Sequence, residues 1–154
     1  MIRYVVAVLL TVAILGLAGL AIDASASDNG EREVRTAIAD IEMAAVQLAA
    51  DEEMSPRVHP NPQRVVELSI PKRSLTTEGV SHFEIEPIDG ADASFARYVL
   101  TDGTTGREII ERRIVYDDPT DDRPTVIGGT GRQTLRLVLR ADENGDPIVV
   151  AESP

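Results

Sequence analysis

The chain opens with an apolar run that is long enough to cross a membrane. Residues 4–22, YVVAVLLTVAILGLAGLAI, contain no charged side chain. A helix of this length spans the roughly 30 Å hydrocarbon core of a bilayer. The apolar region of a signal peptide is shorter, at about 7 to 15 residues. The run therefore predicts a transmembrane anchor over residues 1–22, with the membrane contacted through residues 4–22.

The residues on either side of this run predict its orientation and leave one alternative open. Arg3 precedes the run and Asp23 follows it. Because basic residues stay on the cytoplasmic side, we expect a cytoplasmic N-terminus and an extracytoplasmic C-terminal domain in a single-pass protein of the cell membrane. The small-residue pattern Ala24-Ser25-Ala26 is typical of a signal-peptidase site. Cleavage there would instead release a secreted domain.

A helical period follows within residues 23–53, which we interpret as a linker and an amphipathic helix. Asp28 and Glu31 have the spacing of a capping box, so the helix is expected to begin near Asp28, separated from the anchor by a break at residues 23–30. The apolar stripe must be covered, either by a sheet of the same chain or by a partner helix. As candidate partner-binding residues, the stripe offers Val34, Ile38, Ile41 and Leu48.

Beyond residue 53 the pattern changes to short strands. Three prolines in residues 54–63 predict an extended connector. Strands separated by Gly-containing turns are then expected within residues 64–154. They cover residues 64–70, 81–88, 95–101, 107–116, 132–140 and 147–152. The predicted fold class is α+β: an N-terminal transmembrane helix, an amphipathic helix and an antiparallel β-sheet domain of about six strands.

Charge and composition narrow the function classes. The net charge is −11, with 26 acidic and 15 basic residues, and aromatic residues make up 3%. Such a chain repels phosphate backbones and offers few stacking platforms, so no nucleic acid is expected as a partner. Fourteen arginines accompany the single Lys72. An acidic, arginine-rich surface favours a halophilic origin, with codon bias as the alternative.

Two acidic loops are candidate cation sites. Asp142, Asn144 and Asp146 alternate as the first ligands of a calcium loop do. Pro147 and Ser153 stand where that loop requires Gly and Glu, so an Asn-Gly hairpin turn is favoured. Residues 117–122 carry four aspartates around a proline and are interpreted as a solvated loop.

No motif predicts catalysis. The glycines of residues 126–132 lack the Lys-Ser/Thr pair of a phosphate-binding loop. Ser74 has no Gly-x-Ser-x-Gly context, and His59 and His82 are too few for a zinc site without other ligands. We therefore expect neither an enzyme nor a cofactor. Two adjacent basic residues on this acidic chain are a candidate docking point for an acidic partner: Lys72 and Arg73.

The order of elements resembles that of type IV pilins and pseudopilins, without their processing motifs. The segments MIRYVVAVLL and RVVELSIPKRSLTTEGV, with the proline-rich connector, resemble an uncharacterised family of small membrane-anchored haloarchaeal proteins associated with pilus-type or type II/IV secretion clusters. This resemblance implies a structural or accessory component that binds other proteins on the outer face. The alternative is a secreted domain that binds a cation or small ligand through its acidic loops.

Overall fold

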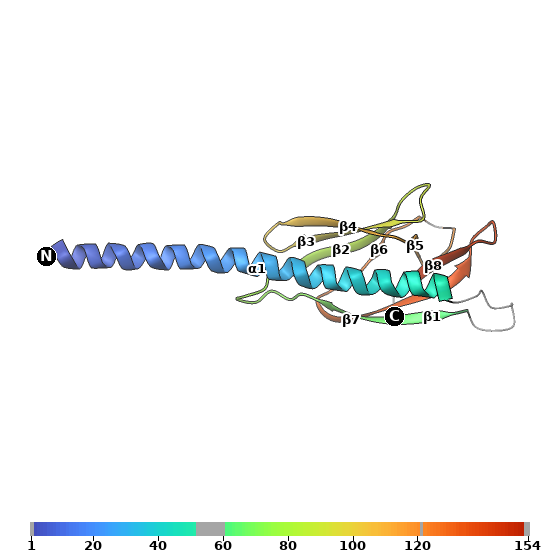
Figure 1. Cartoon of the computed structure of the whole chain (residues 1–154), viewed down its shortest axis with the longest axis horizontal. Coiled ribbons are helices and arrows are strands. Elements are labelled where there is room, and N and C mark those ends of the chain that lie inside the picture. Colours follow the sequence, from blue (N-terminus) through green and yellow to red (C-terminus); the bar gives the residue numbers. More distant parts are fainter. Residues whose placement is uncertain (1, 52–60, 121, 153–154) are drawn as a thin grey trace.

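A single long helix forms the spine of the molecule. The computed structural model describes residues 2–51, 61–120 and 122–152. Helix α1 (Ile2–Asp51) has 50 residues, which corresponds to a length of about 75 Å. Figure 1 shows its first part projecting from the rest of the chain and its second part lying along the strands. We call the strand-containing part the head.

The predicted break at residues 23–30 is wrong, because this segment is helical throughout. Alanine is the best helix former, and Ala24 and Ala26 stand within the segment. The Ser25 hydroxyl donates a hydrogen bond to the Ala21 carbonyl oxygen at 2.9 Å, which keeps this polar side chain on the helix. Asp28 therefore lies inside a helix and caps nothing. The predicted anchor and amphipathic helix are two halves of one element.

Eight strands form two four-stranded sheets. The first sheet has the order β1 (Gln63–Ile70), β7 (Gly131–Ala141), β8 (Pro147–Glu152), β5 (Ile114–Tyr116). The second has the order β4 (Thr105–Ile110), β3 (Ser94–Leu100), β2 (Val80–Pro87), β6 (Thr125–Val126). All neighbours are antiparallel except β5 and β8, which are parallel.

The α+β class is confirmed. The strands form two sheets, however, where a single sheet was expected. The predicted strand over residues 107–116 is split at residues 111–113, so that β4 and β5 belong to different sheets. Strand β6 is only two residues long and gave no periodic signal. Residues 54–60 of the predicted connector, including His59, lie outside the described residues.

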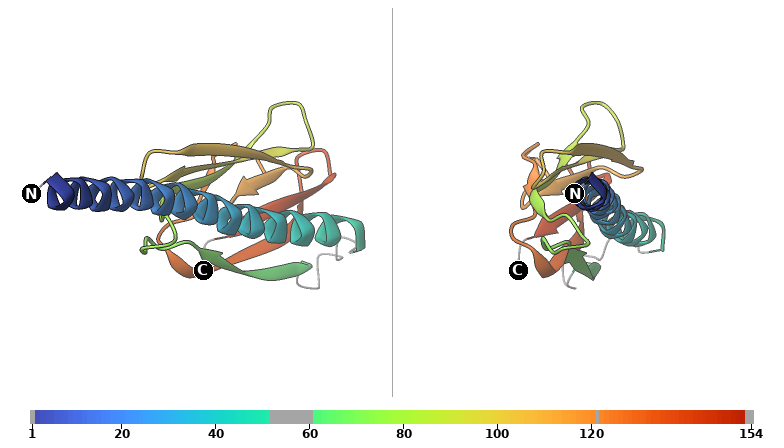
Figure 2. Two further views of the ribbon diagram at one scale, coloured as in Figure 1. Left: turned by 60° about the vertical axis from the view of Figure 1, so that its left-hand side comes forward. Right: turned by 90° about the vertical axis from the view of Figure 1, so that its left-hand side faces the viewer.

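The C-terminal half of α1 completes the core. It packs against both sheets, including their edge strands β1 and β4, and Figure 2 shows it running along the open side between the sheets. Val34, Ile41 and Leu48 are fully buried in one cluster with Phe83 and Leu137. Because the alternate residues of β1 and β7 also face this cluster, one core holds the helix and both sheets together.

Candidate functional site

The first half of α1 is apolar on every face and stays exposed among the residues that the structure describes. Its side chains are exposed from Arg3 to Ile22, with Leu20 at 70% and Ile22 at 53%. An 18-residue stretch of the helix has a mean hydropathy of 2.8, and none of it is buried. By length and composition α1 can cross a membrane. We call residues 3–22 the apolar half and residues 26–50 the packed half.

A loop of the head is hydrogen-bonded to α1 just after the apolar half. We call residues 71–79, between β1 and β2, the junction loop. The Glu78 backbone N–H donates to the Ala26 carbonyl oxygen at 2.8 Å. The Asn29 side-chain amide donates to the Thr76 carbonyl oxygen at 2.7 Å. At Gly30 an added Cβ would lie 2.5 Å from the Glu78 carbonyl oxygen, so only glycine lets the loop approach this closely.

Glu78 is a buried carboxylate at this contact. It is 7% exposed and accepts a hydrogen bond from the Thr101 hydroxyl. The Arg73 Nε atom lies 3.5 Å from its Oε1 atom. A buried charge is costly unless it is hydrogen-bonded and paired. Glu78 therefore connects the junction loop to the turn between β3 and β4.

That turn, residues 101–104, contacts α1 as well. The Ser27 hydroxyl donates to the Asp102 carboxylate at 2.5 Å, and the Thr104 N–H donates to the same group at 2.7 Å. These hydrogen bonds lower the pKa of Asp102 below its usual value, because they stabilise the charged form. The helix is thus held from two sides where it enters the head.

About two turns further along, Arg35 joins the helix to β4. Its guanidinium lies 3.1 Å from Glu31 and 3.1 Å from Glu108. Tyr98 is 1% exposed beneath this cluster. Burial raises the pKa of Tyr98, and the charge of Glu31 raises it further. The two carboxylates beside the phenol, Glu31 and Glu108, are both paired with Arg35. This cluster is therefore a structural contact between helix and sheet.

The structure decides how the predicted apolar stripe is covered. The stripe residues are 0 to 3% exposed and pack against the head of the same chain, so of the two coverings considered it is the chain's own sheets that cover them. They are Val34, Ile38, Ile41 and Leu48. Lys72 and Arg73 lie exposed on the junction loop, where Arg73 pairs with Glu78 and no ion pair of Lys72 is found in residues 2–51, 61–120 and 122–152.

The candidate calcium residues form a hairpin turn between β7 and β8. The Asp142 carboxylate accepts hydrogen bonds from the N–H groups of Asn144 and Asp146, each at 2.8 Å. These donors lower the pKa of Asp142. Across the described parts of the chain, no three His, Cys, Asp or Glu side chains are grouped as metal ligands. The carboxylate caps its own turn instead.

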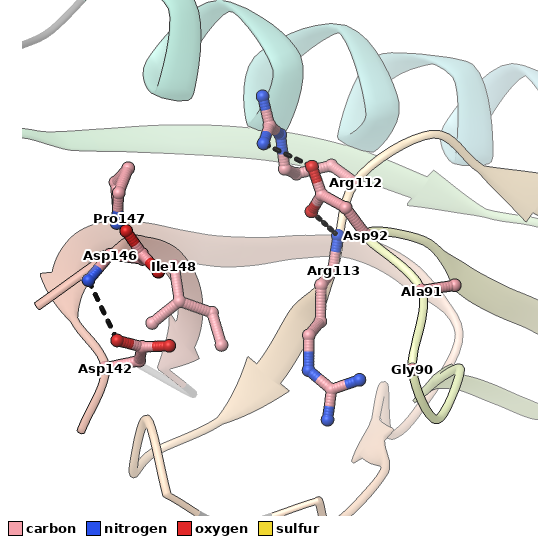
Figure 3. A pocket seen from close by; sticks show the side chains of 9 residues that line it. All are labelled: Gly90, Ala91, Asp92, Arg112, Arg113, Asp142, Asp146, Pro147 and Ile148. Atoms are coloured by element: carbon pink, nitrogen blue, oxygen red, sulfur yellow. Dashed lines mark hydrogen bonds and ion pairs between the residues drawn. The ribbon is translucent and has the colours of Figure 1, made fainter. Parts of the chain in front are cut away.

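A surface depression of about 710 Å³ lies beside this hairpin (Figure 3). Asp92 occupies its wall, where it pairs with the Arg112 guanidinium at 2.5 Å and accepts from the Arg113 N–H at 3.0 Å. Arg113 also donates to the Ile88 carbonyl oxygen at 2.8 Å and pairs with Asp122. Asp92, Arg112 and Arg113 thus pair with charged groups of the chain itself, although the buried Arg112 Nε has no hydrogen-bond partner.

The remaining candidate residues are structural. Ser74 accepts from the Thr76 N–H at 3.2 Å inside the junction loop, and His82 lies exposed beside Glu84 at 3.1 Å. The glycines of residues 126–132 turn the chain from β6 into β7, with Gly129 at φ 81°.

Sequence reasoning missed the contact at the base of the head. Its hydrogen-bonded pairs are 47 residues apart for Asn29 and Thr76, and 75 residues apart for Ser27 and Asp102. No periodicity or spacing in a single sequence links positions that far apart. Gly30 was the one local signal, because an internal glycine in a helix often marks a close approach.

Comparison with known proteins gives a family and no activity. No match is found among the curated proteins or among the solved structures. One family model, described as "Domain of unknown function (DUF7311)", matches residues 1–154. With the whole of its helix and head covered by that model, the chain belongs to the DUF7311 family, which is uncharacterised.

Proposed function

We propose that this protein is a single-pass membrane component of a pilus-like or secretion assembly, and that its head acts on the outer face by binding other proteins. The observation that carries the proposal is the continuity of α1 from Ile2 to Asp51. One rigid element joins an exposed apolar half to a half buried in the head. The direction of the head relative to the bilayer is therefore fixed.

The apolar half needs an apolar environment on all sides. Its side chains are exposed around the whole helix, so lipid or neighbouring helices must cover them. A domain that only needs to stay near a membrane can be attached to its anchor through a flexible linker. A head that must meet its neighbours at a set angle gains from a helix without a break, and this arrangement resembles that of pilin-type subunits.

Two further features support the proposal. The positive-inside rule favours a cytoplasmic N-terminus, because Arg3 precedes the apolar run and Asp23 follows it. The excess of carboxylates and the preference for arginine over lysine fit a protein of a haloarchaeal cell surface, where salt screens charge repulsion.

Retention of the anchor is favoured over cleavage. Ala26, the last residue of the Ala24-Ser25-Ala26 pattern, is 5% exposed and its carbonyl oxygen binds Glu78. Cleavage after Ala26 would remove this contact from the head. A secreted ligand-binding domain remains the alternative, and it predicts a soluble chain that begins at Ser27.

The first test is the intact mass and N-terminal residue of the protein isolated from its native membranes. A chain that begins at or near Met1 in the membrane fraction is expected. A soluble chain that begins at Ser27 would contradict the proposal, and a thermal shift with Ca²⁺ that Asp142→Ala abolishes would then establish the alternative.

A second test addresses assembly. The chain has no cysteine, so single cysteines can be placed in turn at residues 8–13 of the full-length protein in native membranes. Packing against fixed neighbouring helices is expected to give crosslinks at positions three or four residues apart. Ser69→Cys, on the exposed side of β1, serves as the control outside the bilayer. Absence of crosslinks at all six positions would contradict an assembly through the helix.

A further inference from the structure

We propose that the junction loop is a membrane-surface contact: Leu75 enters the interfacial layer of the bilayer, and Lys72 and Arg73 bind the phosphates of anionic lipid headgroups. The inference rests on the proposed membrane span of α1. In this proposal the binding partner of Lys72 and Arg73 is anionic lipid, in place of an acidic protein.

The height of the loop along α1 is fixed by hydrogen bonds. Glu78 binds the carbonyl of Ala26, which is four residues, or about 6 Å, beyond Ile22 at the end of the apolar run. The headgroup layer on each side of a bilayer is about 5 to 7 Å thick. The Glu78 end of the loop is thus held at headgroup height when the apolar run lies in the hydrocarbon core.

The loop also reaches in the right direction. Figure 1 shows the connection between β1 and β2 at the end of the head that faces the projecting part of α1, beside the helix. The 101–104 turn meets the same part of the helix through Ser27 and Asp102. These two segments form the surface of the head that faces the bilayer, and the junction loop is the one with an apolar tip.

The apolar side chain of Leu75 is almost fully exposed to solvent. It is 87% exposed, whereas the other exposed large apolar side chains of the head, such as Val65 at 60% and Ile109 at 58%, are less so. Entry into the interfacial layer would remove its apolar surface from water, which is favourable.

The basic residues of the loop that carries Leu75 suit contact with an anionic membrane surface. Lys72 and Arg73 are exposed on the same loop, in a chain of net charge −11. Two carboxylates at this end of the head are held in hydrogen bonds within the chain, Glu78 by Thr101 and Asp102 by Ser27, whereas Asp28 of α1 is exposed. Without the two basic residues the acidic head would be repelled by anionic lipid. With them, the junction loop carries two exposed basic side chains that anionic headgroups can bind.

The test uses the full-length protein in vesicles of phosphatidylcholine with added anionic phosphatidylglycerol. Since the chain lacks cysteine, a single environment-sensitive fluorophore can be attached to Leu75→Cys. Lipids that carry spin labels near the headgroup or deep in the chains then report depth by quenching. Val65→Cys is the matched control, because it is an exposed apolar position near the opposite end of β1. Ile14→Cys reports on the anchor.

We expect shallow spin labels to quench the Leu75→Cys label strongly and the Val65→Cys label hardly at all. Replacing one basic residue, as in Lys72→Gln, is expected to lower the ratio of inserted to free loop about fivefold in anionic vesicles. The same substitution should change nothing in vesicles of phosphatidylcholine alone, which separates the charge effect from a folding defect.

The possible failures are distinguishable. If deep spin labels do not quench the Ile14→Cys label, the membrane span itself is wrong. If Ile14→Cys is quenched while Leu75→Cys behaves as Val65→Cys does, the anchor stands and the lipid contact is overturned. If quenching at Leu75→Cys does not depend on anionic lipid and is unchanged by Lys72→Gln, the proposed role of Lys72 and Arg73 is overturned. A crosslink from the unquenched loop to an acidic protein in native membranes would replace lipid by a protein partner.

Discussion

Tyr98 shows how single residues hold the helix on the head. Its ring lies over Gly106 of the neighbouring strand β4, where an added Cβ would overlap it. Thr105-Gly106 was expected to form a turn, and the glycine instead makes room for a buried ring inside a strand. Arg35 and Glu31 of α1 lie on the polar side of the same phenol.

Tyr98→Phe should make the stability of the head less sensitive to alkaline pH. The raised pKa means that the folded state favours the neutral phenol. Stability is therefore full below the ordinary pKa of 10.0 and is lost as the pH rises through the higher folded value. Urea unfolding followed by circular dichroism from pH 8 to 11 should show a steeper loss for the natural chain than for Tyr98→Phe. Equal slopes would mean that the phenol does not limit alkaline stability.

At the scale of elements, α1 is one helix with two environments, and its packed half belongs to the core of the head. Leu48 is fully buried, whereas Met43 on the same half is 56% exposed. Large-to-small substitutions in a core leave a cavity, but substitutions at exposed helix positions have small effects.

Leu48→Ala is expected to lower the free energy of unfolding by about 2 to 5 kcal/mol, and Met43→Ala by less than about 0.5 kcal/mol. Chemical denaturation of the detergent-solubilised full-length chain measures both. If the two variants were equally stable, the stripe would not be packed on its own head.

The junction loop can be tested through its glycine. Gly30→Ala gains helix propensity but pushes a Cβ against the Glu78 carbonyl, whereas Gly19→Ala meets nothing within 4 Å. We expect Gly30→Ala to loosen the loop and to speed tryptic cleavage after Lys72 and Arg73. Gly19→Ala is the matched control and should leave the cleavage rate unchanged. An unchanged rate in both variants would show that the close approach at Gly30 does not hold the loop.

For the whole molecule, the dominant feature is the excess of negative charge downstream of the apolar half. The net charge of −11 falls downstream of the apolar half, because Arg3 and Asp23 offset each other. Repulsion among these carboxylates opposes folding, and salt screens it.

Added KCl should therefore stabilise the head. Between about 0.1 M and 1 M the screening length falls from about 10 Å to 3 Å, and we expect Tm to rise by several degrees in thermal unfolding. The double variant Asp89→Asn, Glu143→Gln removes two exposed carboxylates and should show a smaller rise. A Tm that falls with salt would indicate that surface ion pairs outweigh the repulsion.

The orientation of the whole molecule in the cell is a separate prediction. A membrane-impermeant maleimide applied to intact cells should label Ser69→Cys, on the exposed side of β1, and should label Ile2→Cys only after the cells are opened. Labelling of both variants in intact cells, or the reverse pattern, would contradict a cytoplasmic N-terminus.

The sequence alone determined the features that depend on short-range pattern. The uncharged run gave the apolar half of α1, and alternation in segments such as residues 64–70 and 132–140 located β1 and β7 to within a residue or so. It also located the apolar stripe of the packed half, because helical period needs no knowledge of what covers it.

Only the tertiary structure decided what each pattern packs against. The polar residues 23–30 suggested a break because their partners, the junction loop and the 101–104 turn, lie far away in the sequence. The stripe at Val34 and Leu48 could have met a partner helix as well as its own sheets, since burial against either satisfies the same residues. Hydrophobic pattern specifies that a face is buried, and long-range contacts specify against what.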